Sequence, residues 1–233
     1  MLTVVKVGGG LGRGAGDDAL RGLCAAVGAL GELGRRHPLL VVPGGAGFAD
    51  AVRDADRRFG LTATASHRMA ILGMEQFGWV LSELIPRAVR CADLARAREL
   101  AGRRTPVLLP AGLPLDTLPA SWHVTSDSIA AWVADQVGAV RLVLVKEADG
   151  LFADPLARGA PIGRLSVNDL AALRAAGGAE DVDEHLPAML GGARFETWVI
   201  GGRDPARLAE LLEHGTTAGT RIAAGSLLPS GDG

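Results

Sequence analysis

Short apolar runs alternate along the chain with longer amphipathic stretches, and this alternation constrains the fold more than any other feature of the sequence. The short runs have the length of buried strands, whereas the longer stretches carry apolar residues at helical spacing. Strands that alternate with helices form βαβ units, in which the strands run parallel and the helices pack on the sheet. The sequence therefore predicts an α/β fold with a mostly parallel sheet and helices on both faces.

The boundaries of the expected elements follow from the apolar runs, from capping residues, and from Gly and Pro. Strands are expected at residues 2–7, 39–42, 88–91, 107–109, 141–145, 197–200 and 220–223. Helices are expected at residues 17–35, 48–59, 62–85, 126–137, 166–175, 184–190 and 205–214. A Pro- and Gly-rich segment at residues 109–114 lies near the middle of the chain and is the expected junction between two lobes.

The balance of acidic and basic residues limits the classes of partner that the chain is expected to bind. The 233 residues include 24 Lys and Arg against 26 Asp and Glu, which gives a formal net charge of −2. Because the chain lacks the positive charge that nucleic acids and anionic membranes attract, we expect a small-molecule partner, with no nucleic acid and no membrane. No signal-type N-terminus and no uncharged apolar window of about 18 residues occurs, so we expect a soluble, cytoplasmic protein. The two cysteines, Cys24 and Cys91, are interpreted as buried thiols in a reducing compartment.

Lysine occurs at only two positions, Lys6 and Lys146, and all other basic residues are Arg. Both lysines stand at the end of an expected apolar strand. An ammonium group on a flexible stem serves sites that a planar guanidinium does not, so both residues are candidates for a functional site.

Glycines follow two of the expected strands directly. Gly8, Gly9 and Gly10 come after the first strand, and Gly44 and Gly45 come after the second. Ligands bind at the carboxyl ends of parallel strands, where glycine N–H groups and helix N-termini can approach phosphate oxygens. The pair of loops predicts an anion cradle, with ordinary tight turns as the alternative. Neither loop has the lysine position of a Walker A sequence or the acidic residue of a dinucleotide fold.

Polar residues mark two further strand or helix ends. Ser126 and Asp127 stand at the start of an expected helix, where either they cap it or Asp127 orients a lysine or a metal-bound phosphate chain. Lys146 ends a buried strand and is followed by Asp149 and Asp154, a pattern that suits the phosphates and ribose of a nucleotide.

The order of these motifs resembles that of the amino acid kinase family, which includes acetylglutamate, aspartate, uridylate and isopentenyl phosphate kinases. The resemblance covers nearly the whole chain, through residues 6–10, 43–47, 125–131, 146–155, 201–203 and 219–222. Within the family, residues 66–76 and 122–131 are most similar to the kinases of methanofuran biosynthesis, which phosphorylate an aminomethylfuran-methanol phosphate. The resemblance implies the amino acid kinase fold, a three-layer αβα sandwich with a mostly parallel central sheet. It also implies one domain over residues 1–233, with an acceptor lobe near 1–115 and a nucleotide lobe near 116–228.

The resemblance also implies the roles of individual residues. Catalysis would rest on positioning and charge neutralisation by Lys6, Asp127 and Lys146, with ATP and Mg²⁺ as cofactors and no metal ligand among the side chains. The residues implied for ATP and phosphate are Gly8, Gly9, Gly10, Lys146, Asp149, Gly150, Phe152, Asp154 and Pro155. Those implied for the acceptor are Gly44, Gly45, His67, Arg68, Met74, Thr125 and Ser126. A homo-oligomer, dimeric or larger, is expected by the same analogy.

One position departs from the family pattern. Many relatives carry a second lysine after a proline where this chain has Ala188 after Pro187. Either Lys146 supplies the missing charge, or the protein binds nucleotide without efficient catalysis. The main expectation is thus a kinase that converts a small phosphate into a diphosphate. The alternatives are a kinase of a carboxylate such as an N-acyl amino acid, and a non-catalytic nucleotide- or oxyanion-binding protein that resembles the molybdenum storage proteins.

Overall fold

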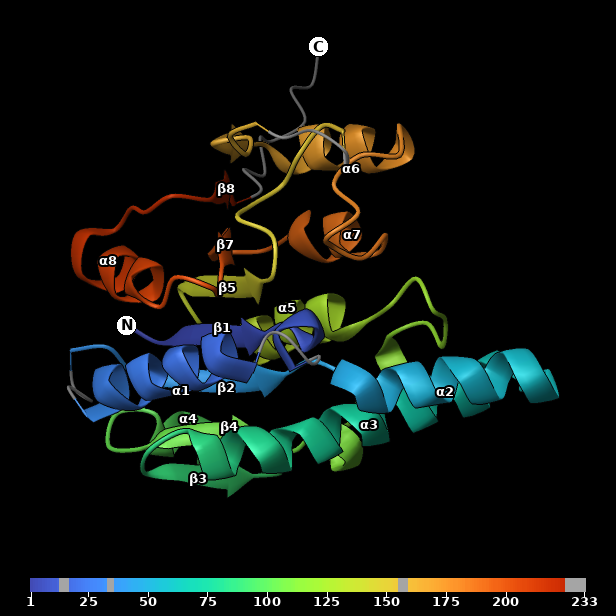
Figure 1. Cartoon of the computed structure of the whole chain (residues 1–233), viewed down its shortest axis with the longest axis horizontal. Helices are drawn as coiled ribbons and strands as arrows, with labels where there is room; N and C mark the ends of the chain where they lie inside the picture. Colours follow the sequence, from blue (N-terminus) through green and yellow to red (C-terminus); the bar gives the residue numbers. More distant parts are fainter. Residues whose placement is uncertain (13–16, 33–35, 155–158, 225–233) are drawn as a thin grey trace, which may run out of the picture.

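A computed structural model describes residues 1–12, 17–32, 36–154 and 159–224 of the chain (Figure 1). In this part of the chain eight strands form one sheet, in the order β3-β4-β2-β1-β5-β7-β8-β6. The strands are β1 (Thr3–Val7), β2 (Leu39–Pro43), β3 (Ala88–Cys91), β4 (Thr105–Leu108), β5 (Arg141–Lys146), β6 (Arg164–Leu165), β7 (Glu196–Gly201) and β8 (Thr220–Ile222). Neighbouring strands are parallel except for β7 and β8, so the mostly parallel sheet is confirmed.

The described helices agree with most of the expected ones. The α-helices are α1 (Asp17–Glu32), α2 (Ala46–Phe59), α3 (Ala63–Leu84), α4 (Leu94–Leu100), α5 (Ser126–Gln136), α6 (Val167–Ala175), α7 (Leu186–Leu190) and α8 (Ala206–His214). Short 3₁₀ turns include η1 (Gly9–Gly12), directly after β1. The expectation missed α4 and β6, which have only seven and two residues. Residues 33–35 of the first expected helix lie outside the described part of the chain.

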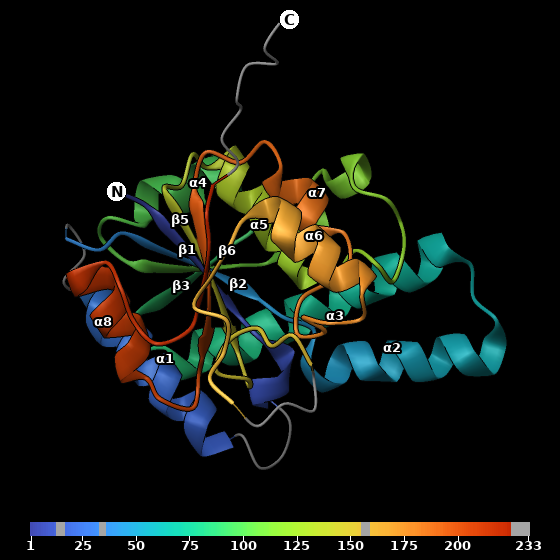
Figure 2. The same cartoon turned by 90° about the horizontal axis from the view of Figure 1, so that it is seen from above.

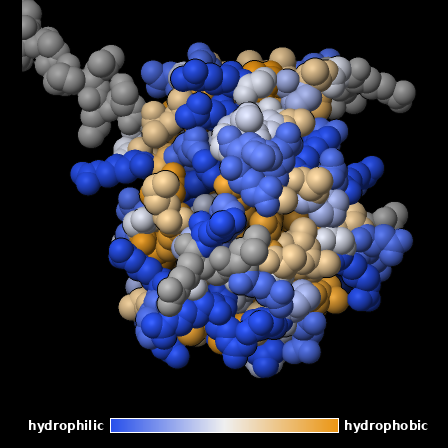
Figure 3. Space-filling model, turned by 90° about the vertical axis from the view of Figure 1, so that its left-hand side faces the viewer, coloured by the Kyte–Doolittle hydropathy of each residue, from blue (hydrophilic) through white to orange (hydrophobic). Residues whose placement is uncertain are grey.

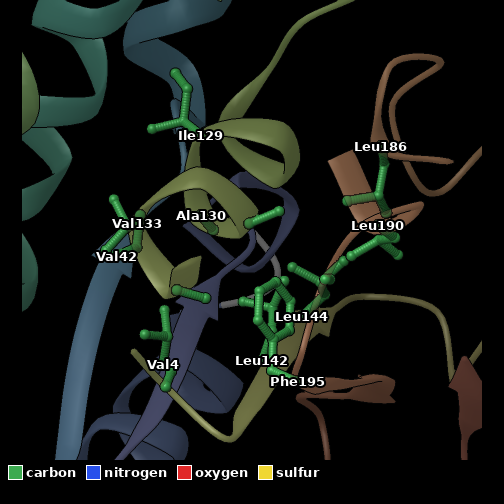
Figure 4. Packing of buried hydrophobic residues seen from close by; sticks show 14 of the residues in the cluster. Val4, Val42, Ile129, Ala130, Val133, Leu142, Leu144, Leu186, Leu190 and Phe195 are labelled. Atoms are coloured by element: carbon green, nitrogen blue, oxygen red, sulfur yellow. The ribbon is translucent and has the colours of Figure 1, made fainter. Parts of the chain in front are cut away.

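The helices cover both faces of the sheet, as a three-layer αβα sandwich requires. Figure 2 shows α1 and α8 on one side and α5, α6 and α7 on the other. Successive strand residues point to opposite faces, so Val5 packs against α1 and α8 whereas Val4 packs against α5. Ile129, Ala130 and Val133 of α5 belong to the same buried apolar cluster as side chains of the central strands, and Figure 4 shows Val133 beside Val42 of β2.

Helices α2 and α3 form an antiparallel pair that projects beyond the carboxyl ends of the central strands (Figures 1 and 2). The pair is continuous with β2, because α2 begins three residues after the strand ends. Thr62 ends the connection between the helices and caps α3 by accepting a hydrogen bond from the Ala65 amide. The pair therefore forms a wall beside the edge of the sheet where the glycine loops lie.

The surface is mixed in character. In the side view of Figure 3, hydrophilic residues predominate and apolar residues form small separate groups. Exposed large apolar side chains gather instead on α3, where Met69, Leu72, Trp79 and Val80 are more than one-third exposed. Both cysteines are buried and unpaired, as expected. Among the described residues, no helix is long and apolar enough to cross a membrane.

Candidate active site

Buried Lys6 and partly buried Lys146 share one buried carboxylate, that of Asp127. Lys6 Nζ lies 2.7 Å from Asp127 Oδ1. Lys146 Nζ donates to both oxygens of Asp127, at 2.8 and 2.6 Å. Lys6 and Asp127 are only 3% and 2% exposed. The structure thus brings together the three residues to which the family resemblance assigned catalysis.

The strand alternation explains why both lysines reach the same carboxylate. Lys6 points to the same face of the sheet as Val4, and Lys146 points to the same face as Leu144. Helix α5 covers that face, and Asp127 lies in its first turn. The partial positive charge at a helix N-terminus favours a carboxylate there, in addition to the two ammonium groups.

Burial and charge act in opposite directions on this cluster. Burial lowers the pKa of Lys6 to about 8, although the Asp127 carboxylate raises it, and the Lys146 ammonium lowers it further. Burial would raise the pKa of Asp127, but the charges of Lys146 and Lys6 outweigh that effect and hold it at about 2. With all three groups ionised, the cluster carries an excess positive charge, which an anionic ligand would neutralise.

The cluster opens into a cavity of about 330 Å³. One end is polar and contains the lysines, the carboxylate and the glycine loops. The other end is built by α2, α3 and the segment before α5, with apolar walls that include Ile71, Met74 and Val124. Of the site residues expected from the sequence, those that line the cavity are Lys6, Gly9, Gly10, Gly45, His67, Met74, Thr125, Ser126, Asp127 and Lys146.

The two glycine loops pack against each other backbone to backbone. A Cβ atom on Gly9 would lie 2.5 Å from the Ala46 nitrogen, and one on Gly44 would lie 2.6 Å from the Gly9 nitrogen. The amides of Gly8 and Gly44 donate to the carbonyls of Val145 and Val7, so these two glycines hold the loops in place. Gly45 precedes α2 without a side-chain cap, and it lines the cavity with Ala46. The first-turn amides of α2 are therefore suited to an anion at this end of the cavity.

The part of the cavity that α2, α3 and the segment before α5 build contains a histidine and a tryptophan. Burial lowers the pKa of His67, which favours its neutral ring, whereas a hydrogen bond with the Ser121 backbone opposes this shift. The Nε2 atom is buried without a hydrogen-bond partner among the described residues. The Trp122 indole donates from Nε1 to Asp56 Oδ2 at 2.7 Å. The guanidinium of Arg53 lies 5.0 Å from the centre of the Trp122 ring, within the range of a cation–π contact. The indole is thus held in place as part of the cavity wall.

Several expected site residues lie elsewhere. The Arg68 side chain pairs with Asp116 outside this cavity. Asp149 pairs with Arg207 at 2.7 Å, in the loop after β5 that continues through Gly150, Phe152 and Asp154. This loop does not line the cavity, and Pro155 lies outside the described residues. The later family motifs do converge on the loop, because Gly202 donates to the Lys146 carbonyl and the Thr220 hydroxyl accepts from the Leu151 amide, both at 2.8 Å.

Ala188, at which the chain departs from the family pattern, lies away from the two lysines. Ala188 is exposed on α7 and lines a second hollow between α6 and α7. It is not among the described residues that line the Lys6 cavity. In this conformation, Lys146 already provides a second ammonium group beside Asp127.

The structure adds residues to the site that the sequence did not suggest. They are Ala46, Ala49, Arg53, Ala70, Ile71, Trp122, Val124, Ile129, Glu180, Asp181, Val182 and Asp183. Burial raises the pKa of Asp181, a shift that the Lys146 charge opposes. Trp122 is the first residue of the segment 122–131 that the family resemblance singled out, although no role was assigned to it, but nothing in the sequence near Arg53 or Asp183 signals a place in the site.

Comparison with known proteins shows which sequences and folds the chain resembles. The sequence model of the amino acid kinase family matches residues 1–200. The chain is 29% identical to [5-(aminomethyl)furan-3-yl]methyl phosphate kinase from Methanocaldococcus jannaschii, over 75% of this chain and 79% of that protein. It is 32% identical to acetylglutamate kinase from Bifidobacterium animalis subsp. lactis, over 56% of this chain and 41% of that protein.

Solved structures show the same fold. Uridylate kinase from Archaeoglobus fulgidus superimposes with a TM-score of 0.74 at 22% identity, over 96% of this chain and all of the other. UMP kinase from Bacillus anthracis superimposes with a TM-score of 0.71 at 16% identity, over 96% of both chains. At these identities the likeness concerns the fold alone.

Proposed function

Because this chain belongs to the amino acid kinase family, we propose that it transfers the γ-phosphoryl group of ATP to a small organic phosphate and forms a diphosphate. The proposed acceptor is an aminomethylfuran-methanol phosphate, and the proposed pathway is the biosynthesis of a methanofuran-type cofactor. The similarity to the kinase from Methanocaldococcus jannaschii supports this choice of acceptor.

The observation that carries the proposal is the Lys6–Asp127–Lys146 cluster beside the start of α2. Phosphoryl transfer needs little covalent chemistry from the protein, but it does need reactants in line and neutralised charge on the transferring group. The ammonium groups of buried Lys6 and partly buried Lys146, together with the uncapped amides of α2, supply positive charge to one cavity. A buried excess of positive charge suits a polyanionic substrate better than a structural role.

Each member of the cluster has a distinct proposed role. Lys6 contacts the transferring phosphoryl group. Lys146, which ends β5 in the C-terminal half of the chain, contacts the phosphates of ATP. Asp127 holds both ammonium groups in place and stays paired with them during the reaction. Mg²⁺ bound together with the nucleotide would neutralise negative charge on its phosphates.

The two ends of the cavity suggest how the substrates are arranged. The His67 Nε2 atom is buried without a partner among the described residues, and because the other ring nitrogen bonds the Ser121 backbone, Nε2 of the neutral ring can accept a hydrogen bond from a donor group of the acceptor. Met74 and Trp122 form a wall that suits a small flat ring. We place the acceptor phosphate at the polar end of the cavity, beside the lysines, with Gly45, Thr125 and Ser126 around it. We place the nucleotide in the C-terminal half, against the loop that contains Asp149, Gly150, Phe152 and Asp154.

Release of ADP with different acceptors tests this proposal. The purified chain is incubated with ATP, Mg²⁺ and, one at a time, the aminomethylfuran-methanol phosphate, isopentenyl phosphate, UMP and N-acetylglutamate. We expect the furan compound to give the highest kcat/KM. A higher value with N-acetylglutamate would support a carboxylate kinase instead. ATP binding without ADP release from any acceptor would contradict the proposed activity and support the non-catalytic alternative.

A further inference from the structure

Asp183 lies in the segment before α7, yet its carboxylate organises the start of α5. Asp183 is 8% exposed. Its Oδ2 atom accepts hydrogen bonds from the Thr125 amide at 2.9 Å, the Thr125 hydroxyl at 2.9 Å and the Ser128 amide at 3.0 Å. Its Oδ1 atom accepts from the Ser128 hydroxyl at 2.6 Å and the Leu186 amide at 2.8 Å.

The backbone donors in this set are amides that their own helices leave without a partner. Thr125 and Ser128 stand at the N-cap and in the first turn of α5, and Leu186 is the first residue of α7. One carboxylate therefore caps two helices that are far apart in the sequence. Such charge-assisted hydrogen bonds are stronger and shorter than neutral ones.

This capping interaction surrounds the residue that holds the two lysines. Asp127 lies between Thr125 and Ser128, so its backbone is fixed on both sides by Asp183. The Asp183 amide also donates to Asp127 Oδ2 at 3.3 Å. The orientation of the Asp127 carboxylate, and hence the position of both ammonium groups, depends on contacts with Asp183.

We propose that Asp183 is a positioning residue for phosphoryl transfer, which holds the first turn of α5 so that Asp127 bridges Lys6 and Lys146. The inference rests on the proposed function, because it assumes that the Lys6–Asp127–Lys146 cluster carries the reaction. It also connects the acidic segment Glu180–Asp183, which lines the cavity, with the catalytic cluster.

Two substitutions separate positioning from charge. Asp183→Asn and Asp183→Ala both remove the negative charge, but the amide oxygen of Asn can still accept from Thr125 and Ser128. We expect kcat to fall about 100-fold in Asp183→Ala and about 10-fold in Asp183→Asn, with KM for both substrates changed by less than about 3-fold. Asp93→Ala is the matched control, since Asp93 caps α4 by accepting from the Arg96 amide at 2.7 Å, away from the cavity.

A second readout does not depend on activity. Because the chain has two lysines, a sample labelled with ¹³C at the lysine ε-carbon gives two NMR signals, one from Lys6 and one from Lys146. Asp127 raises the pKa of Lys6 and Lys146 lowers it, so a displaced Asp127 lowers the Lys6 titration midpoint below its value of about 8. We expect a larger decrease in Asp183→Ala than in Asp183→Asn, and no change in Asp93→Ala.

The outcomes separate this inference from the proposed function. Equal NMR titrations in the wild type and both Asp183 variants would overturn the inference, whether or not the wild type transfers phosphate. If the wild type shows no transfer with any acceptor, the proposed function fails. The order of the Lys6 titration midpoints in the wild type and the two Asp183 variants still decides whether Asp183 positions Asp127. If Asp183→Ala does not fold, Ser128→Ala removes the 2.6 Å bond alone and should lower kcat about 3-fold without a KM change. An unchanged kcat in that variant would count against the inference.

Discussion

Replacement of Lys6 by methionine should stabilise the protein and abolish its activity. The ordinary lysine pKa of 10.5 is lowered to about 8 at this position, so the folded state disfavours the ammonium form. Since a tenfold change in an equilibrium constant corresponds to about 1.4 kcal/mol, the charged Lys6 costs about 3 kcal/mol of unfolding free energy at neutral pH. Methionine has a similar length, carries no charge, and leaves Asp127 paired with Lys146.

The sign of the Lys6 contribution to the unfolding free energy follows from how that free energy changes with pH. Below about pH 8 the lysine is charged in both states and the full cost is present. Between about pH 8 and 10.5 the folded protein has lost this proton and the unfolded chain has not, so the stability of the wild type rises. The advantage of Lys6→Met should therefore reach about 3 kcal/mol near pH 7 and disappear by about pH 10.5.

Urea denaturation of both proteins at a series of pH values measures this difference. The two curves of unfolding free energy should converge as the pH rises, while ADP release by Lys6→Met remains at background. A variant that is less stable than the wild type at pH 7, or a difference that does not change up to pH 10.5, would refute the reasoning about Lys6. Retained turnover would remove Lys6 from the mechanism.

Three further predictions concern other parts of the molecule. Trp122→Leu should raise the KM for the acceptor about 5-fold or more in steady-state kinetics, because an aromatic stacking surface contributes about 1–3 kcal/mol, and it should leave the KM for ATP unchanged. Trp79→Leu, which removes an indole that also packs under an arginine but lies outside the cavity, should change neither KM. Asp127→Asn should lower the unfolding free energy by about 2 kcal/mol at pH 7, as the Asp127 pKa of about 2 implies. The wild type should lose this contribution as the pH falls from about 4 to 2, whereas the unfolding free energy of the variant should lack this decrease. If the exposed apolar face of α3 is the contact of a homo-oligomer, Leu72→Arg should reduce the mass measured by light scattering to that of one chain, and an unchanged mass would exclude that contact.

Most of the fold is readable from the sequence because strand and helix periodicities are local properties. The central strands are continuous apolar runs, and their boundaries differ from expectation by one or two residues. Helix α4 was missed because seven residues are too few to show a clear periodicity, although Asp93 is a suitable cap. Strand β6 has two residues and owes its assignment to pairing with β8.

The site was accessible to sequence reasoning where chain geometry places residues together. Lys6 and Lys146 end neighbouring parallel strands on the same face, so their proximity follows from the alternation of side chains. The contact between Asp183 and Thr125 joins residues 58 positions apart and depends on how α7 packs beside α5. No local pattern encodes that arrangement. The same holds for Arg53 and Trp122, which meet through the projection of α2 from the sheet.

Phosphorus NMR tests the central claim most directly, because it detects the bond that the proposed reaction forms. The purified chain is incubated with ATP, Mg²⁺ and the aminomethylfuran-methanol phosphate, beside a matched sample of Lys6→Met. We predict that the acceptor's single phosphate resonance is replaced by two coupled diphosphate resonances in the wild-type sample and persists in the variant. An acceptor resonance that persists in the wild-type sample while ATP is bound, or that is converted equally in both samples, would contradict the account.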